Sequence, residues 1–95
     1  MDTQALYNEN EVLTDLRKGC ENAFTKLYRH YSLSLYYNIL SFVKDEHIAE
    51  ELVQEVFTKV WRYHANISIE KNFSSYLYVM ARNQVLDFFA QVTKD

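Results

Sequence analysis

The sequence predicts an all-α protein, a compact bundle of about four helices. Its 95 residues include no proline and one glycine, Gly19, although these residue types mark the turns that strand-rich domains need. Apolar residues make up 48% of the chain and aromatic residues 16%, which is enough for one hydrophobic core and excludes a typical disordered segment. We therefore expect a single domain over residues 1–95.

The first two helices are predicted from apolar residues at helical spacing. Residues 1 to about 9 are polar and suggest a frayed lead-in, and a short helix then ends at Gly19, which suits a left-handed C-terminal cap. This helix places three apolar residues on one side, Val12, Leu13 and Leu16. A second helix is predicted from an N-cap at Asn22 to about Val43. Its apolar stripe consists of Phe24, Leu27, Tyr28, Tyr31, Leu35, Ile39, Phe42 and Val43.

The second half of the chain predicts two more helices with a loop between them. Asp45 suits the N-cap of a third helix, whose inward stripe is Ile48, Ala49, Leu52, Val53, Val56, Phe57, Val60 and Trp61. Residues from about 63 to 72 lose this periodicity and are predicted to form a loop. A fourth helix is expected over about residues 73–90, capped by Asn72 or Ser74, while the last residues, QVTKD, do not suggest a structured terminus. Its inward face is predicted to comprise Phe73, Tyr76, Leu77, Met80, Ala81 and Phe88.

The residues do not form a recognised catalytic or metal-binding set, so no enzyme activity, metal or other cofactor is expected. His47, Glu50 and Glu51 share the start of the third helix, where one metal could be reached, but further ligands would have to come from other helices. Cys20 lacks a nucleophile motif and is more simply a small buried residue. A single glycine cannot supply a glycine-rich phosphate loop. The longest apolar run, residues 76–81, is too short to span a membrane, and the first residues do not resemble a secretory signal.

Two segments in the second half of the chain carry a specific pattern. The first is DEHIAEELVQEVFTKVW, and its distinctive residues are Asp45, Ala49, Glu50, Glu51, Gln54, Glu55, Val56, Phe57 and Trp61. The second is FSSYLYVMARNQVLDFF, and its distinctive residues are Phe73, Tyr76, Leu77, Tyr78, Ala81, Arg82, Asn83 and Asp87. Their order and separation resemble region 2 of a bacterial sigma factor of the sigma-70 family, most closely the extracytoplasmic-function group. Tyr76 stands where that family usually has Trp, and Ala90 and Gln91 stand where it often has basic residues.

The resemblance, which covers about residues 12–90, implies a non-catalytic promoter-recognition module of bacterial RNA polymerase. In the family, the third helix docks on the clamp helices of the largest polymerase subunit, and the acidic and amide face of this helix suits a basic partner. The expected polymerase-binding residues are Glu50, Glu51, Gln54, Glu55, Thr58 and Arg62. From composition alone, the same face would be taken as an ordinary solvated helix surface.

The resemblance also implies capture of unpaired non-template bases of the −10 promoter element. The expected DNA-binding residues are Lys71, Asn72, Tyr78, Arg82, Asn83 and Gln84, because amides recognise base edges and aromatic faces stack on bases. Asn83 matches the family position that helps to separate the duplex, and the loop 66–72 matches the family's pocket for a flipped base. The net charge of −3 argues against tight DNA binding by the free chain.

Several of these aromatic and basic residues have simpler alternatives. Tyr78 could be a half-buried core residue, and Arg82 could be an ordinary helix-surface residue or form an intramolecular salt bridge. Four further aromatic residues are expected in the core rather than at the DNA, namely Phe57, Trp61, Phe73 and Tyr76.

The expected setting is the cytoplasm, with the polymerase core and promoter DNA as partners. The family adds an anti-sigma protein as a partner, although no residue here identifies one. A single cysteine is compatible with that compartment, and no direct membrane insertion is expected. The family's region 4, a helix-turn-helix that recognises the −35 element, is not present in this chain, which we therefore expect to be part of a longer sigma factor. The alternative is a helical protein–protein interaction module with no DNA role.

Overall fold

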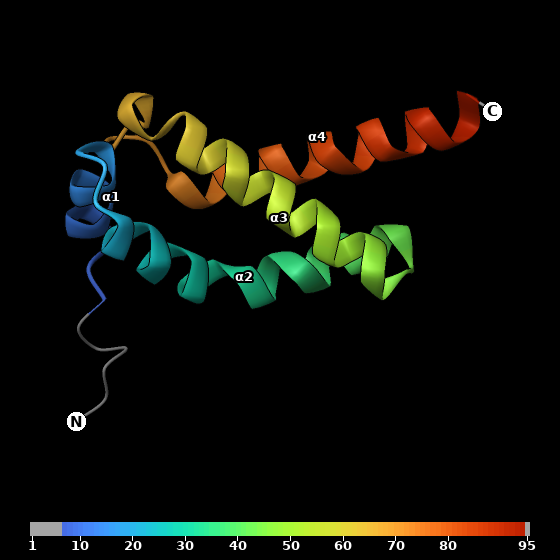
Figure 1. Cartoon of the computed structure of the whole chain (residues 1–95), viewed down its shortest axis with the longest axis horizontal. Coiled ribbons are helices and arrows are strands. Elements are labelled where there is room, and N and C mark those ends of the chain that lie inside the picture. The colour runs from blue at the N-terminus through green and yellow to red at the C-terminus, as the bar shows by residue number, and fades with distance from the viewer. Residues whose placement is uncertain (1–6, 95) are drawn as a thin grey trace.

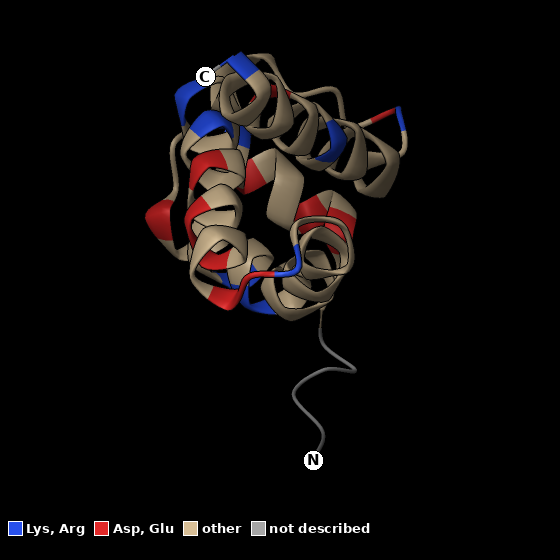
Figure 2. Ribbon diagram, turned by 90° about the vertical axis from the view of Figure 1, so that its right-hand side faces the viewer, with Lys and Arg blue, Asp and Glu red and all other residues tan. Residues whose placement is uncertain are grey.

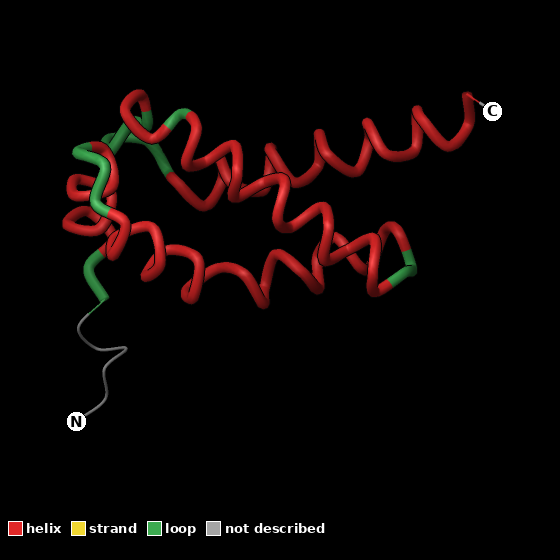
Figure 3. Tube along the Cα trace, viewed as in Figure 1, coloured by secondary structure: helices red, strands yellow, loops and turns green. Residues whose placement is uncertain are grey.

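Four α-helices and one 3-10 helix form the described part of the chain, residues 7–94 of a computed structural model. They are α1 (Glu9–Arg17), α2 (Glu21–Val43), α3 (Glu46–Arg62), η2 (His64–Asn66) and α4 (Phe73–Lys94). α2 and α3 form a helical hairpin, and α4 crosses α3 (Figure 1; Figure 3). No strand occurs within residues 7–94, so the all-α prediction is confirmed. The predicted lead-in lies mostly outside these residues.

The turn between α1 and α2 uses the glycine that was predicted there. Gly19 has a φ of 87°, in the left-handed region that a side chain disfavours, and its N–H donates to the carbonyl of Leu16 at 2.9 Å. α2 begins directly afterwards, with Cys20 at its N-cap position and no capping side chain, so the predicted N-cap at Asn22 is wrong. Gly19 completes the turn early enough for Asn22 to lie already inside the helix.

Replacing Gly19 with alanine should destabilise the fold by about 1 kcal/mol, the cost of a left-handed backbone for a residue with a Cβ. Space is not limiting, because a Cβ at this position would lie 3.6 Å from the Nε2 atom of His64. Chemical denaturation followed by circular dichroism measures the change. Lys18→Ala is the control, since Lys18 has an ordinary φ of −82°. Equal stability of the two variants would contradict this account.

The corner between α2 and α3 consists of two residues. Lys44 adopts a left-handed conformation with a φ of 60°, and its N–H donates to the carbonyl of Leu40 at 2.9 Å. Asp45 then caps α3 as predicted, because its Oδ1 accepts the N–H of Ile48 at 3.0 Å. The short corner sends α3 back along α2, and these two helices pack against each other.

The core is built from aromatic and aliphatic residues of all four α-helices. Its fully buried members include Phe57, Phe73, Leu13, Leu16, Leu27, Leu35, Ile39, Leu77, Val56 and Val60. The ring of Phe57 lies 4.8 Å from that of Tyr28 and 6.3 Å from that of Phe24, measured between centroids. Tyr31 of α2 lies 5.7 Å from Phe73 of α4. α2 therefore packs against each of the other three α-helices.

Two residues that were predicted in the core are exposed instead. Phe42, near the end of α2, is 56% exposed, and Tyr76, in the first turn of α4, is 39% exposed. Phe42 is the second-last residue of α2, and α4 leads away from the corner between α2 and α3 (Figure 1). Tyr76 lies beside, rather than within, the buried stripe that includes Phe73 and Leu77.

The loop before α4 is anchored by Ile67, which is 5% exposed and belongs to the core. Asn72, one of the two predicted caps, accepts the N–H of Ser75 at 3.1 Å. α4 then continues to Lys94, so the expectation of an unstructured end is wrong for residues 91–94, where no glycine or proline stops the helix. None of the helices within residues 7–94 is both long and apolar enough to cross a membrane.

Candidate functional site

The outer face of α3 carries all six residues that the resemblance assigns to polymerase binding. Glu50, Glu51, Gln54, Glu55, Thr58 and Arg62 are exposed, and steps of three and four residues keep them on one side of the helix. The buried stripe of α3 lies on the other side and includes Ala49, Val56 and Val60. Acidic positions dominate the first turns of the helix and basic positions its last turn (Figure 2).

Hydrogen bonds hold several of these side chains in place. Gln54 donates from Nε2 to the hydroxyl of Tyr28 at 2.9 Å, which ties α3 to α2. The hydroxyl of Thr58 donates to the backbone carbonyl of Gln54 at 2.8 Å. The Nε2 atom of His47 lies 3.3 Å from a carboxylate oxygen of Glu51. Such contacts reduce the side-chain entropy that a partner would have to remove on binding.

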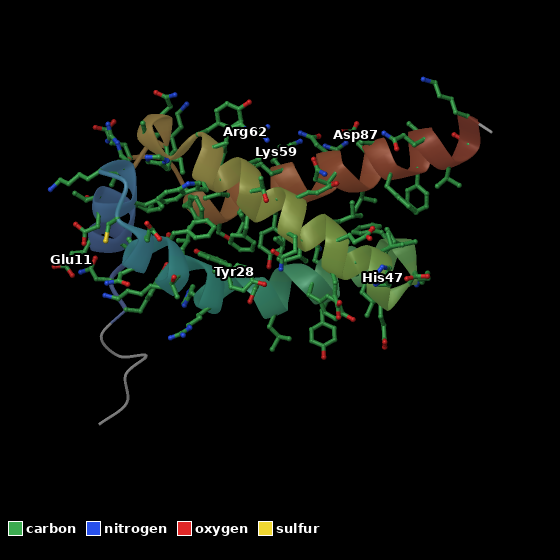
Figure 4. All side chains as sticks on the ribbon, in the orientation of Figure 1. Glu11, Tyr28, His47, Lys59, Arg62 and Asp87 are labelled. Carbon is green, nitrogen blue, oxygen red and sulfur yellow. The ribbon has the colours of Figure 1, made fainter. Side chains whose placement is uncertain are left out.

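An open groove runs along each side of this face. The groove between α2 and α3 has a volume of about 460 Å³ and is lined by Glu50, Glu51, Gln54, Tyr28, Tyr36 and neighbouring residues. The groove between α3 and α4 has a volume of about 510 Å³, and its lining includes Glu51, Glu55, Thr58, Arg62 and Gln84. Figure 4 labels Lys59, Arg62 and Asp87 on the side of the second groove. Partial burial, and then the charges of Glu46 and Glu50, raise the pKa of Tyr36 in the first groove, so its hydroxyl stays protonated.

The residues expected to bind DNA do not form one cluster. Lys71, Asn72, Arg82 and Asn83 are exposed. Eleven residues separate Asn72 from Asn83, about 16 Å along the helix axis, so the structure groups Arg82 with Asn83 but places the loop residues apart from them. The Oδ1 atom of Asn72 is occupied by its role as a cap.

Two of the alternatives considered for these residues can be compared with the structure. Tyr78 is half-buried and its hydroxyl is hydrogen-bonded to the hydroxyl of Ser34 on α2, which agrees with a partly structural role. Arg82 is exposed on α4, which agrees with the helix-surface alternative. It forms no intramolecular salt bridge within residues 7–94, where the one side-chain ion pair is that of His47 with Glu51.

Gln84 is not on the exposed surface where the sequence pattern predicted it. Its side chain is 6% exposed and lies against α3, where its amide nitrogen donates to Glu55 and its amide oxygen accepts from Lys59. The amide is therefore occupied inside the protein and does not present an edge to a base. The spacing contained a signal for this burial, because Gln84 follows Leu77 and Ala81 and precedes Phe88 at steps of four, three and four.

Two exposed tyrosines near the start of α4 were not predicted from the sequence as functional residues. Tyr63 is 49% exposed and Tyr76 is 39% exposed. Burial raises the pKa of Tyr76, and the charge of Tyr63 raises it further. Tyr76 also precedes Asn83 by seven residues, which places the two on the same side of α4. Tyr76, which stands where the family usually has Trp, is therefore an exposed aromatic residue here.

The alternative metal site at the start of α3 lacks further ligands. His47 and Glu51 contact each other, but no group of three or more His, Cys, Asp or Glu residues able to hold a metal occurs in the described region. Cys20 is half-buried and belongs to the turn that follows α1.

Comparisons with known proteins agree with the sequence motifs. The Sigma-70 region 2 family matches residues 27–94. A curated relative, the ECF RNA polymerase sigma factor SigM of Bacillus subtilis (strain 168), is 30% identical over 70 residues, which are 74% of this chain and 42% of the relative. The chain thus spans less than half the length of that relative.

A solved structure shows the same fold. It is the NMR structure of an engineered region 2 of sigmaE in complex with GTAAAA, with a TM-score of 0.84 and 24% sequence identity, and the match covers 96% of this chain and 93% of the other. Its helical fold agrees with the bundle described above. Because the family match extends from α2 to the end of α4, this protein belongs to the Sigma-70 region 2 family.

Proposed function

We propose that this chain is the promoter-recognition module of an extracytoplasmic-function sigma factor. It docks on the clamp helices of RNA polymerase through α3 and captures unpaired non-template bases of the −10 element through α4 and the loop before it. The observation that carries this proposal is that two separate polar surfaces are exposed on one domain of the Sigma-70 region 2 family. Six polar residues occupy the outer face of α3, whereas Arg82 and Asn83 are exposed on α4.

The polymerase surface is supported by its charge and its shape. Glu50, Glu51 and Glu55 give the face an acidic character that complements a basic helix pair. The grooves on both sides provide space for long side chains of the partner. Tight docking here would let a protein with little affinity of its own for DNA act at promoters.

The DNA surface is supported by its combination of amide, guanidinium and aromatic groups. Asn83 can recognise a base edge, Arg82 can contact a phosphate or a base, and Tyr76 and Tyr63 offer rings on which bases stack. Lys71 and Asn72 extend this surface into the loop. The similar solved structure is that of a complex with GTAAAA, which supports a nucleic-acid role for the fold. The net charge of −3 supports DNA binding within the holoenzyme rather than by the free chain.

The proposed module is a single non-catalytic domain that acts in the cytoplasm, where polymerase and promoter meet. Its core lies in about residues 12–90, and a region 4 outside this chain would recognise the −35 element. An anti-sigma protein would compete with polymerase for one of the exposed surfaces.

Asn83→Ala should reduce promoter opening by roughly tenfold, because the amide that recognises a base edge is lost. The measurement is open-complex formation by polymerase assembled with the variant. Docking on polymerase should stay unchanged, since Asn83 lies on α4 and is exposed. Asn22→Ala is the matched control, an exposed amide on α2 outside both proposed surfaces.

Normal opening by the Asn83→Ala variant would remove this residue from the proposed DNA contacts. A broader test of the DNA role is whether the protein distinguishes the two strands of the −10 element. Assembled with polymerase, the protein should prefer the non-template −10 oligonucleotide over its complement. Equal binding of both strands would favour the interaction module without a DNA role.

A further inference from the structure

Among residues 7–94, Gln84 is the one polar residue that the fold buries. Its amide nitrogen donates to the carboxylate of Glu55, and its amide oxygen accepts from the ammonium group of Lys59. This orientation of the amide follows from its partners, because a carboxylate only accepts and an ammonium group only donates. No buried polar side-chain atom in the described region lacks a partner. The bridge between α4 and α3 is therefore complete.

Glu55 and Lys59 are one turn apart on α3, a spacing at which Glu and Lys commonly pair directly. Here they form no direct ion pair within 4.0 Å, because the amide of Gln84 links them instead. The side chains of Glu55 and Lys59 on α3 are thus each hydrogen-bonded to Gln84 of α4. Partly buried networks of this kind favour one arrangement of their side chains when all their members are satisfied.

We infer that Gln84 is a positioning residue for polymerase docking, which orients Glu55 on the docking face and fixes α4 against α3. The inference rests on the proposed function, since Glu55 is one of the proposed polymerase contacts. Gln84 lines the groove between α3 and α4 together with Glu51, Glu55 and Arg62. It also directly follows Arg82 and Asn83 in the chain, so the same bridge sets the rotation of α4 that presents these two residues to solvent.

The first test is the binding of the Gln84→Leu variant to the isolated clamp helices, at a temperature where circular dichroism shows it folded. Binding should weaken by about tenfold, because Glu55 and Lys59 are released from their shared partner. Asn22→Leu is the matched control, since Asn22 is an exposed amide on α2 and lines neither groove beside the outer face of α3. Its binding should equal that of the unmodified chain. Wild-type affinity of folded Gln84→Leu would overturn the inference.

A double-mutant cycle separates positioning from general destabilisation. In a Glu55→Ala background, Gln84→Leu should cause no further loss of binding, because the side chain that it positions is gone. Equal losses in both backgrounds would assign Gln84 a structural role only and overturn the inference. If Glu55→Ala leaves binding unchanged while the unmodified chain binds, the docking role of Gln84 falls but the proposed function stands on the other contacts.

A reciprocal exchange keeps the bridge testable if Gln84→Leu does not fold. Gln84→Glu should lower the melting temperature, because it brings two carboxylates together. Adding Glu55→Gln should restore the melting temperature, since an amide then donates to a carboxylate that also accepts from Lys59. No restoration would overturn the bridge. If the unmodified chain does not bind the clamp helices at all, the proposed function fails with the docking role, and the melting comparison still decides whether Gln84 bridges the helices.

Discussion

The double charge reversal Glu51→Lys/Glu55→Lys is expected to weaken binding to the isolated clamp helices by at least about 100-fold. Both carboxylates are exposed on the outer face of α3 and both line the groove toward α4. A basic partner attracted by these groups would be repelled after the reversal. At physiological salt, screening weakens the interaction between charges more than about 8 Å apart. A large loss of affinity would therefore identify residues in direct contact with the partner. Titration calorimetry or fluorescence anisotropy gives the affinity.

The control for this experiment is the pair Glu11→Lys/Asp15→Lys on α1. Both residues are exposed, and Figure 4 places Glu11 at the opposite end of the molecule from His47, which lies in the first turn of α3. Each double reversal moves the formal net charge from −3 to +1, so the variants differ only in where the charge changes. The control should bind normally. Equal losses in both variants would contradict a localised docking face, and no binding by folded unmodified protein would favour the interaction module.

Phe57→Ala is expected to destabilise the protein by about 3–5 kcal/mol, the usual cost of removing a buried phenylalanine ring. Phe57 is 2% exposed, and its ring contacts both Tyr28 and Phe24 of α2. Domains are stable by only about 5–15 kcal/mol, so this variant should lose much of its stability. Urea denaturation followed by circular dichroism measures the loss.

Phe42→Ala provides the comparison for this prediction. Phe42 is also a phenylalanine of the helical hairpin but is 56% exposed, so its removal should change the stability by less than about 1 kcal/mol. Similar losses in the two variants would show that the packing around Phe57 is not what holds α2 and α3 together.

The sequence allowed the helices and their local signals to be predicted, because both depend on residues close together in the chain. Asp45 as a cap, Gly19 as a left-handed turn and the buried stripe of α3 are all confirmed. The family pattern led to the six residues of the outer face of α3, and the structure places all of them on one exposed side. Their role in polymerase binding stays a prediction.

The errors concern the places where helices meet or separate. Phe42 and Tyr76 belong to apolar patterns, yet each lies where no neighbouring helix covers it. Gln84 is polar, yet it is buried because α4 lies against α3 at this turn. Its amide is hydrogen-bonded there to Glu55 and Lys59. A periodic pattern specifies which residues share a side of one helix, but the crossing of two helices depends on residues distant in sequence. The clearest errors therefore fall on α4, which packs against both α2 and α3.

The two-residue corner between α2 and α3 brings together the helix ends on either side of it, so the contacts next to the corner join residues near each other in the chain. α4 depends on more distant contacts, such as that of Tyr78 with Ser34, 44 residues earlier. Closing such long loops is entropically costly, so contacts within the hairpin should form early in folding and those of α4 late. Substitutions at Ile39, a buried residue of α2 close to the corner, should then slow folding, whereas substitutions at Tyr78 should mainly accelerate unfolding. The polymerase surface would acquire its final shape in the last step, when α4 reaches Glu55.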